Sequence, residues 1–222
     1  VCVRDWRAAR DAAGAAARPD WRGGAGAGLA LVAAVLAGAL WFQREATLGV
    51  RYAARNFYGV LRILERPAIN PKEQMLGLMH GRIWHGWQFV DPDQARRPTL
   101  CYGPPSGVGL ALGALPTGPR RLGVVGLGIG SLTAYAEPGD YVRYYEINPE
   151  VHRIAASRFT CLSRCPAKVE VVIGDARLSL EREPPQEFDL LVLDAFSSDA
   201  IPAHLLTADS FAIYQRHLKT NG

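Results

Sequence analysis

The chain has 222 residues, 49% of them hydrophobic and 21% charged, so it can bury a sizeable core in one domain with an appendage. Its net charge of +4 comes from scattered arginines rather than a basic patch, which argues against nucleic acid as a partner. The four cysteines are too irregularly spaced for a disulfide framework. Cys161 and Cys165 could supply half of a metal site, but no matching pair or histidine cluster accompanies them, and we expect no metal.

Residues 1–22 form a polar N-terminal segment rich in Ala, Arg and Asp. The stretch Gly23–Phe42 then runs for twenty residues without a charge, enough helix to cross about 30 Å of hydrocarbon. We therefore predict a transmembrane helix over residues 23–42. A buried Gly/Ala-rich helix and a linker are the alternatives, because glycine lowers helix propensity. The chain begins at Val1 and ends at Gly222 just after a turn, so we expect a segment of a longer protein.

Residues 43–103 are predicted to form a linker helix followed by a small β domain. The sequence first looks helical and becomes strand-like at Tyr58–Leu64, and further extended runs follow at Met75–Met79 and Arg82–Phe89. Short strands separated by glycine turns are typical of an antiparallel β unit. A short helix is expected over Ser106–Leu115.

Residues 104–222 alternate apolar runs with helix-like stretches, which predicts an α/β domain with a parallel sheet. Four runs have the composition of buried strands: Leu122–Val125, Tyr141–Tyr145, Val169–Ile173 and Phe188–Leu193. Ligands of such sheets bind at the carboxyl ends of the strands. The residues that follow each run are therefore the candidates for a binding site.

The first of these strands is followed by the loop Gly126-Leu-Gly128-Ile-Gly130 and a helix-like stretch, Ser131–Ala136. Glycines at this position permit a tight turn and a close approach of the backbone to a ligand. A purely structural turn is the alternative. A phosphate-binding P-loop is excluded, because no Lys-Ser/Thr pair follows the glycines.

Acidic residues follow the next two strands. Glu146 can accept hydrogen bonds from both hydroxyls of a ribose, as in dinucleotide enzymes, although it could also be a solvated charge. Asp175 is placed to accept from the exocyclic amine of adenine, and Ala176 can offer its backbone N–H to a ring nitrogen. The Gly174-Asp175 pair is also a common turn. This further acid favours an S-adenosyl donor over a dinucleotide.

The most apolar strand ends at Asp194, whose carboxylate should face the crevice of the sheet. There it can orient or deprotonate a nucleophile. Asp199 lies five residues further on and could bind a cationic amine. Alternatively, Asp199 caps a helix that starts near Pro202.

Together these motifs resemble the spermidine synthase (polyamine aminopropyltransferase) family, most closely its bacterial branch fused to a transporter-like membrane region. The matching segments are Gly126–Gly130, Tyr145–Pro149, Gly174–Arg177, Leu193–Pro202, Arg55–Arg62, His80-Gly81 and Cys101–Gly107. The resemblance implies a Rossmann-like, S-adenosylmethionine-methyltransferase-type parallel sheet with a small N-terminal β unit. It also implies that residues 23–42 are the last span before a cytoplasmic domain at the bacterial inner membrane. The resemblance is also compatible with a homodimer.

The resemblance further implies roles for individual residues. Glu146 would hold the ribose of the donor, and Asp175 and Ala176 would hold its adenine. Asp194 would be the catalytic carboxylate that helps deprotonate the attacking amine. Tyr102 would lie near that amine and contribute to its binding. The donor would be decarboxylated S-adenosylmethionine, used as a co-substrate without any prosthetic group, and the acceptor would be a polyamine.

Asp199 would match a polyamine-binding acid in a loop that is two residues longer here than in the family. Other positions depart from the family more strongly. The glycine loop carries Ile129 where the family has an acid, Gly59 replaces a donor-binding glutamine, and His80–Trp84 replaces an Asp-Gly-x-x-Gln hairpin. The motifs that would bind the nucleoside are kept, whereas fewer of the motifs that would bind the polyamine are present. A methyltransferase using S-adenosylmethionine and a non-catalytic nucleoside-sensing module therefore stay open as alternatives.

Overall fold

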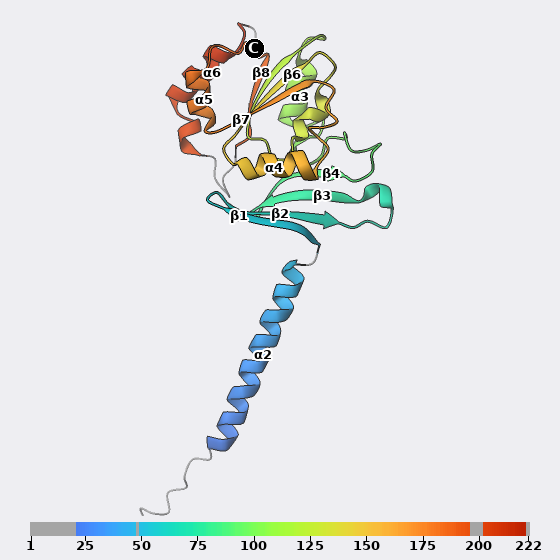
Figure 1. Ribbon diagram of the computed structural model, residues 1–222, viewed down its shortest axis with the longest axis vertical. Coiled ribbons are helices and arrows are strands. Elements are labelled where there is room, and N and C mark those ends of the chain that lie inside the picture. Colours follow the sequence, from blue (N-terminus) through green and yellow to red (C-terminus); the bar gives the residue numbers. More distant parts are fainter. Residues whose placement is uncertain (1–20, 48, 196–201, 221–222) are drawn as a thin grey trace, which may run out of the picture. The chain divides into compact units, whose positions relative to one another are not determined.

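The computed structural model describes residues 21–47, 49–195 and 202–220, which belong to two compact units, Val1–Leu48 and Gly49–Gly222 (Figure 1). The described part of the first unit is helix α2 (Trp21–Thr47), so the uncharged stretch Gly23–Phe42 is helical. Within the described residues, no helix is long and apolar enough to cross a membrane. The transmembrane span predicted over this stretch therefore has no support from the structure.

The second unit begins with an antiparallel sheet in the order β1-β2-β3-β4. Its strands are β1 (Val50–Asn56), β2 (Gly59–Arg66), β3 (Met75–His80) and β4 (Ile83–Phe89). The predicted antiparallel unit is confirmed, but its first strand begins earlier than the sequence indicated. The side chains of β1 alternate between half-buried and exposed because the strand pairs with β2, and its Arg and Ala residues conceal that alternation in the sequence.

A parallel sheet follows in the order β7-β6-β5-β8. Its strands are β5 (Arg121–Val125), β6 (Tyr141–Glu146), β7 (Lys168–Ile173) and β8 (Leu190–Leu193). All four predicted strands are present. The strand order reverses at β5, which has β6 on one side and β8 on the other. A crevice for ligands is expected outside the carboxyl end of such a strand.

Within the described residues of this unit, four helices and four 3₁₀ turns complete the fold. The helices are α3 (Gly107–Ala114), α4 (Pro149–Arg158), α5 (Ala176–Arg182) and α6 (Ala208–His217). The 3₁₀ turns are η1 (Pro71–Glu73), η2 (Leu100–Tyr102), η3 (Ser131–Tyr135) and η4 (Ala203–Leu205). The predicted helix over Ser106–Leu115 is confirmed as α3, which Ser106 caps by accepting from the Gly109 N–H at 3.0 Å. The helix-like stretch after the glycine loop is the 3₁₀ turn η3 instead.

Hydrophobic clusters cover the two faces of the parallel sheet. Val124 and Val125 are adjacent on β5 yet belong to different clusters, because successive strand residues point to opposite faces. The first cluster joins both sheets and includes Leu61, Ile63, Leu78, Leu122, Val142 and Ile154. The second lies beneath α5 and α6 and includes Tyr145, Leu180, Phe188 and Tyr214. The two sheets thus share one core, and α4 lies between them (Figure 1).

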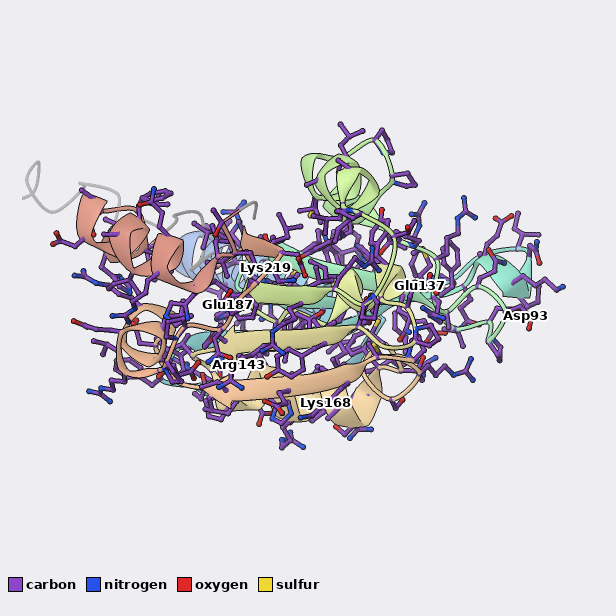
Figure 2. The ribbon with its side chains drawn as sticks, turned by 90° about the horizontal axis from the view of Figure 1, so that it is seen from above. Asp93, Glu137, Arg143, Lys168, Glu187 and Lys219 are labelled. Atoms are coloured by element: carbon purple, nitrogen blue, oxygen red, sulfur yellow. The ribbon has the colours of Figure 1, made fainter. Side chains whose placement is uncertain are left out.

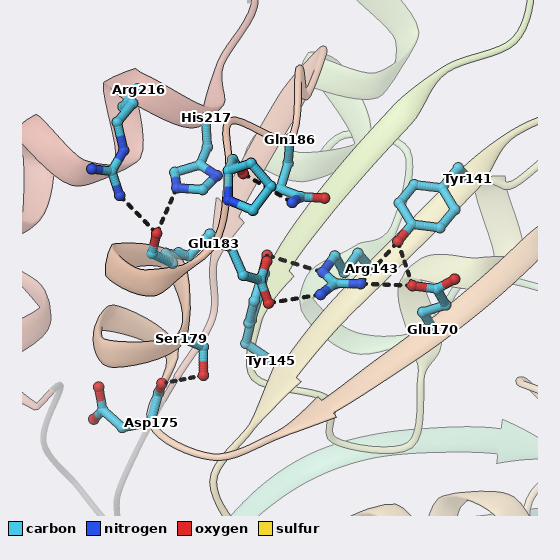
Figure 3. A network of polar contacts seen from close by, with 12 residues as sticks. Tyr141, Arg143, Tyr145, Glu170, Asp175, Ser179, Glu183, Gln186, Arg216 and His217 are labelled. Carbon is cyan, nitrogen blue, oxygen red and sulfur yellow. Dashed lines mark hydrogen bonds and ion pairs between the residues drawn. The ribbon is translucent and has the colours of Figure 1, made fainter.

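A polar network ties α5 to the parallel sheet. Figure 2 shows the strands from above, with Arg143 on β6 and Lys168 at the start of β7. The Arg143 guanidinium lies 2.6 Å from Glu170 on β7 and 2.7 Å from Glu183 at the end of α5 (Figure 3). The hydroxyl of Tyr145 donates to the same Glu183 at 2.9 Å. This network holds the far end of α5, whose other end lies at the carboxyl edge of the sheet.

Candidate active site

A cavity of about 510 Å³ lies at the carboxyl ends of the four parallel strands. Residues that follow each of these strands line it, and so do residues of the β1–β2 and β3–β4 hairpins and of η2 and η4. The volume suits a small organic ligand or cofactor, for which pockets of about 300–1,000 Å³ are usual. The predicted site residues within its lining are Tyr102, Gly126, Gly128, Glu146, Asp175, Ala176 and Asp194.

The glycine loop after β5 has a backbone that other residues rarely adopt. Gly126, Gly128 and Gly130 have φ angles of +96°, +55° and +84°. A Cβ atom on Gly126 would lie 2.4 Å from the carbonyl oxygen of Asp194, and one on Gly128 would lie 2.4 Å from that of His85. Conversely, a Cβ on Gly86 of β4 would lie 2.5 Å from Cγ1 of Ile129. The loop thus fits tightly between β8 and the antiparallel sheet.

The third glycine has a different place from the first two. Gly126 and Gly128 line the cavity, whereas the Cβ position of Gly130 faces Leu162 at 2.7 Å. Gly130 therefore shapes the turn into η3 rather than the wall of the cavity. This is the structural-turn role that the sequence left open, here for one glycine of the three.

Glu146 ends β6 with only 7% of its surface exposed. One carboxylate oxygen accepts from the Leu127 N–H at 3.0 Å, and the other accepts from the Asn148 N–H at 2.8 Å. Burial raises the pKa of Glu146, while these backbone donors favour its ionised form. Each oxygen keeps one further lone pair, so the fixed carboxylate can accept from two neighbouring hydroxyl groups.

Asp175 ends the loop after β7 and begins α5. Its Oδ1 accepts from the Leu178 N–H at 2.9 Å, which caps the helix, and its Oδ2 lies 2.8 Å from Nε2 of His204. Asp175 therefore lies in the turn that the sequence left open, caps α5, which the sequence did not indicate, and also lines the cavity. His204, on η4, was not predicted, because only the packing of η4 against α5 brings it to Asp175.

Asp194, which follows β8, and Tyr102, which ends η2, meet in the cavity. The hydroxyl of Tyr102 donates to Oδ2 of Asp194, and the hydroxyl of Tyr135 donates to the backbone carbonyl of Tyr102 at 2.5 Å. Burial raises the pKa of Asp194, and the hydrogen bond from Tyr102 acts in the opposite direction. Burial and the charge of Asp194 raise the pKa of Tyr102 well above its usual value. Tyr102 is therefore a neutral donor beside a half-buried carboxylate.

The antiparallel sheet brings histidine and aromatic rings to the same cavity. The rings of His80 and His85 lie 5.5 Å apart, and Nε2 of His80 is 2.6 Å from the carbonyl oxygen of Tyr58. Burial, with a smaller effect from His80, lowers the pKa of His85 to about 4, so this imidazole is neutral near pH 7. Phe57 and Trp84 also line the cavity. The sequence marked this hairpin as unlike its counterpart in the resembled family, but it did not indicate that these rings form a wall.

Comparisons with known proteins were made on sequence and on structure. No family model matches the chain. Over 109 residues it is 34% identical to a polyamine aminopropyltransferase from Vibrio vulnificus, an alignment covering 47% of this chain and 36% of that protein. The chain therefore spans about a third of the length of this curated relative.

Three solved structures share its architecture. Spermidine synthase from Thermotoga maritima matches with a TM-score of 0.52 at 18% identity, covering 77% of this chain and 54% of that one. A probable spermidine synthase from Corynebacterium glutamicum gives 0.58 at 18% identity, covering 76% and 60%. A spermidine synthase in complex with the transition state analogue AdoDATO gives 0.53 at 17% identity, covering 77% and 55%. The chain has the spermidine synthase fold.

The spermidine synthase fold confirms the predicted Rossmann-like parallel sheet with a small N-terminal β unit. The comparisons give no support to the expected fusion with a transporter-like membrane region. Asp199 lies outside the described residues. Cys101 lines the cavity and, like Cys161 and Cys165, is a free thiol. Among the residues that the structure describes, no group of three or more His, Cys, Asp or Glu could hold a metal ion.

Proposed function

We propose that this protein is an aminopropyltransferase that moves an aminopropyl group from decarboxylated S-adenosylmethionine to an amine. The observation that carries the proposal is the convergence of Glu146, Asp175 and Asp194, from three strand ends, on one cavity that also contains Tyr102. The sequence similarity to a polyamine aminopropyltransferase and the spermidine synthase fold support it.

The nucleoside of the donor is assigned to the β6 and β7 ends of the cavity. Glu146 would accept from the two ribose hydroxyls through the lone pairs that its backbone partners leave free. Asp175 and the backbone N–H of Ala176 would recognise the adenine edge. Because Asp175 is already engaged by His204 and by the cap of α5, it is held in one orientation before any ligand binds.

The reaction is a displacement at carbon. The amine nitrogen attacks the methylene beside the sulfonium, the C–N bond forms as the C–S bond breaks, and methylthioadenosine leaves as a neutral thioether. Only a neutral nitrogen has the lone pair for this attack, so a protonated amine must lose one proton before or as the C–N bond forms, and the product amine carries the remaining positive charge. Positioning the amine in line with the C–S bond and removing that proton are the tasks left to the protein.

Asp194 is suited to both tasks. A free amine acceptor has a pKa near that of lysine, about 10.4, so it arrives as a cation that the half-buried carboxylate attracts. Tyr102 occupies Oδ2 of Asp194, which leaves Oδ1 to accept from the amine and to receive its proton. Because Tyr102 stays a phenol, its hydrogen bond favours the ionised form of the carboxylate, against the effect of burial, and fixes its orientation.

A methyltransferase that uses S-adenosylmethionine is the second candidate. The side chain at the centre of the glycine loop is Ile129, which is fully buried and does not line the cavity. The carboxylates of the described cavity lining are Glu146, Asp175 and Asp194, and the proposal already uses each of them. No further acid of that described lining is left to select the amino group of a decarboxylated donor.

A product assay separates the two candidates. The protein is incubated with decarboxylated S-adenosylmethionine or with S-adenosylmethionine, each with a panel of mono- and diamines, and nucleoside products are measured by mass spectrometry. We expect methylthioadenosine from the decarboxylated donor, in amounts that depend on the amine. S-adenosylhomocysteine as the product would establish the methyltransferase instead. No turnover of either donor, with nucleoside binding retained, would favour the sensing module.

Two expectations from the sequence accompany this proposal. The reaction would take place in the cytoplasm, because the donor is made there. A homodimer, which the family resemblance left open, would be detected as a doubled mass in light scattering of the purified protein.

A further inference from the structure

A buried amide beside Glu146 has unused hydrogen-bonding capacity. Asn148 is only 2% exposed and lines the cavity. Its amide nitrogen, Nδ2, is buried and has no partner among the residues that the structure describes. Buried polar groups are nearly always hydrogen-bonded, so an unpaired donor in a cavity wall indicates a ligand atom or an ordered water.

The orientation of this amide is fixed by its neighbours. The backbone N–H of Glu150 donates to the Asn148 side chain at 3.0 Å, so the atom it contacts must be the oxygen. Asn56 donates to the same oxygen at 2.6 Å, and its own oxygen accepts from the Tyr58 N–H at 3.0 Å. The two backbone donors, Glu150 and Tyr58, thus fix which end of each side-chain amide is the oxygen, in Asn148 and in Asn56. The remaining atom of Asn148 can only be the NH₂ group.

Asn148 and Glu146 complement each other. The backbone N–H of Asn148 donates to Glu146 at 2.8 Å, which places the two residues at the same end of the cavity. The ionised carboxylate can only accept hydrogen bonds, whereas the free NH₂ group can only donate. A hydroxyl group does both. A pair of adjacent hydroxyls could therefore donate to Glu146 while one of their oxygens accepts from Asn148.

We infer that Asn148 is a second ribose-binding residue, which donates from Nδ2 to a hydroxyl oxygen of the donor's cis-diol. The inference rests on the proposed adenosyl site and adds a hydrogen-bond donor for the ribose hydroxyls beside the acceptor that Glu146 provides. Asparagine also suits the position better than aspartate. An aspartate could cap α4 equally well, but it would offer no donor and would place a second charge beside the buried Glu146.

The test compares two ligands and two matched variants by calorimetric titration at pH 8, which favours the ionised form of Glu146. The ligands are 5′-methylthioadenosine and its 2′,3′-dideoxy counterpart. Asn148→Asp is isosteric and keeps the capping oxygen. We expect it to weaken binding of methylthioadenosine at least tenfold while changing the affinity for the dideoxy ligand less than threefold. Asn148→Ser, which adds no charge, should show the same selective loss.

Asn70→Asp is the matched control. Asn70 precedes a proline, as Asn148 does, and its side chain accepts from the Lys72 N–H at 3.1 Å, but it is exposed and does not line the cavity. This variant should leave both affinities unchanged. An equal loss for both ligands in the Asn148 variants, or no loss, refutes the inference and leaves the adenosyl site standing. Failure of the unmodified protein to bind either ligand refutes the adenosyl site and the inference together.

Discussion

The parallel and antiparallel sheets face the same cavity, but they contribute different chemistry to it. The parallel sheet provides carboxylates at its strand ends, in Glu146, Asp175 and Asp194. The antiparallel sheet provides neutral rings, among them His85 and Trp84. One side can bind hydroxyls, amines and cations through charge, whereas the other can exclude water and shape the space beside them.

This difference shows how strongly topology positions a functional group. The carboxyl ends of parallel strands meet at one edge of a sheet, so an acid after each strand reaches the same crevice whatever the surrounding packing. A hairpin side chain reaches it only if strand register, bulges and turn geometry all agree. The parallel side therefore defines the nucleoside part of the proposed site, and the rings of the antiparallel side line the rest of the cavity.

Replacing Asp194, the carboxylate assigned to the acceptor amine, should have the largest effect on turnover. Asp194→Asn keeps the shape of the side chain but removes its charge, so turnover should fall by about a hundredfold or more. Binding of methylthioadenosine, assigned to Glu146 and Asp175, should stay within about threefold. Steady-state kinetics and calorimetry on the same preparation measure the two quantities. Undiminished turnover would remove Asp194 from the mechanism.

Removing one of the acids assigned to the nucleoside should have the second-largest effect, on ligand affinity. Glu146→Gln and Asp175→Ala should each weaken methylthioadenosine binding by about ten- to a hundredfold, since a hydrogen bond to a charged group contributes about 1.5–3 kcal/mol. Asp175→Ala also removes the cap of α5, so Thr207→Ala, which removes the cap of α6 away from the cavity, is its control. Thr207→Ala should cost stability, by about 1 kcal/mol, without a loss of affinity. Equal affinities in all three variants would contradict the assignment.

Replacing His85 of the antiparallel sheet should change how folding stability depends on pH in the acid range, rather than the affinity for the nucleoside. The pKa of His85 is about 4 in the folded protein, against about 6.5 when unfolded, so between these values only the unfolded chain takes up the proton. Folding stability must therefore fall as the pH drops from 7 to 5, by about 2 kcal/mol from this group. Denaturant unfolding of His85→Gln at both pH values should lack that loss. A variant that loses as much stability as its parent would show that His85 titrates normally.

The smallest expected effect concerns the contact of η4 with the nucleoside side. His204 is 48% exposed, and solvent-exposed pairs contribute about 0–1 kcal/mol, so His204→Gln should weaken methylthioadenosine binding no more than about fivefold. Calorimetric titration checks this. A gain in affinity would mean that the imidazole competes with adenine for Asp175 instead of holding it in place.

The parts of the fold that the sequence revealed are those governed by local pattern. Runs rich in apolar, β-branched and aromatic residues marked β5, β6 and β7, although Arg143 and Glu170 interrupt the last two. The first strand was hidden, since Val50–Asn56 carries Arg and Ala where a half-buried strand usually has larger apolar residues. The stretch after the glycine loop looked helical but forms a 3₁₀ turn, Ser131–Tyr135, that ends after five residues.

The site residues also divide into those that a local sequence pattern revealed and those that only tertiary packing brings together. Glu146 and Asp194 were predicted to face the crevice because their strands determine where they lie. The contact of His204 with Asp175 and the unpaired amide of Asn148 depend on packing between segments distant in the chain, which no local pattern records. The approach of Tyr102 to Asp194 followed only from the family resemblance, because 92 residues separate them.

The mutual fit of the glycine loop and β4 bears on how this architecture can be re-engineered. Gly86 accommodates Ile129 of the loop, and Gly128 accommodates the backbone of His85 on the strand, so each segment has a notch for the other. A chimaera that takes its antiparallel sheet from a relative with a larger residue at the position of Gly86 would clash with Ile129. Attempts to graft a new acceptor specificity onto this nucleoside half should therefore transfer the strand and the loop as one cassette.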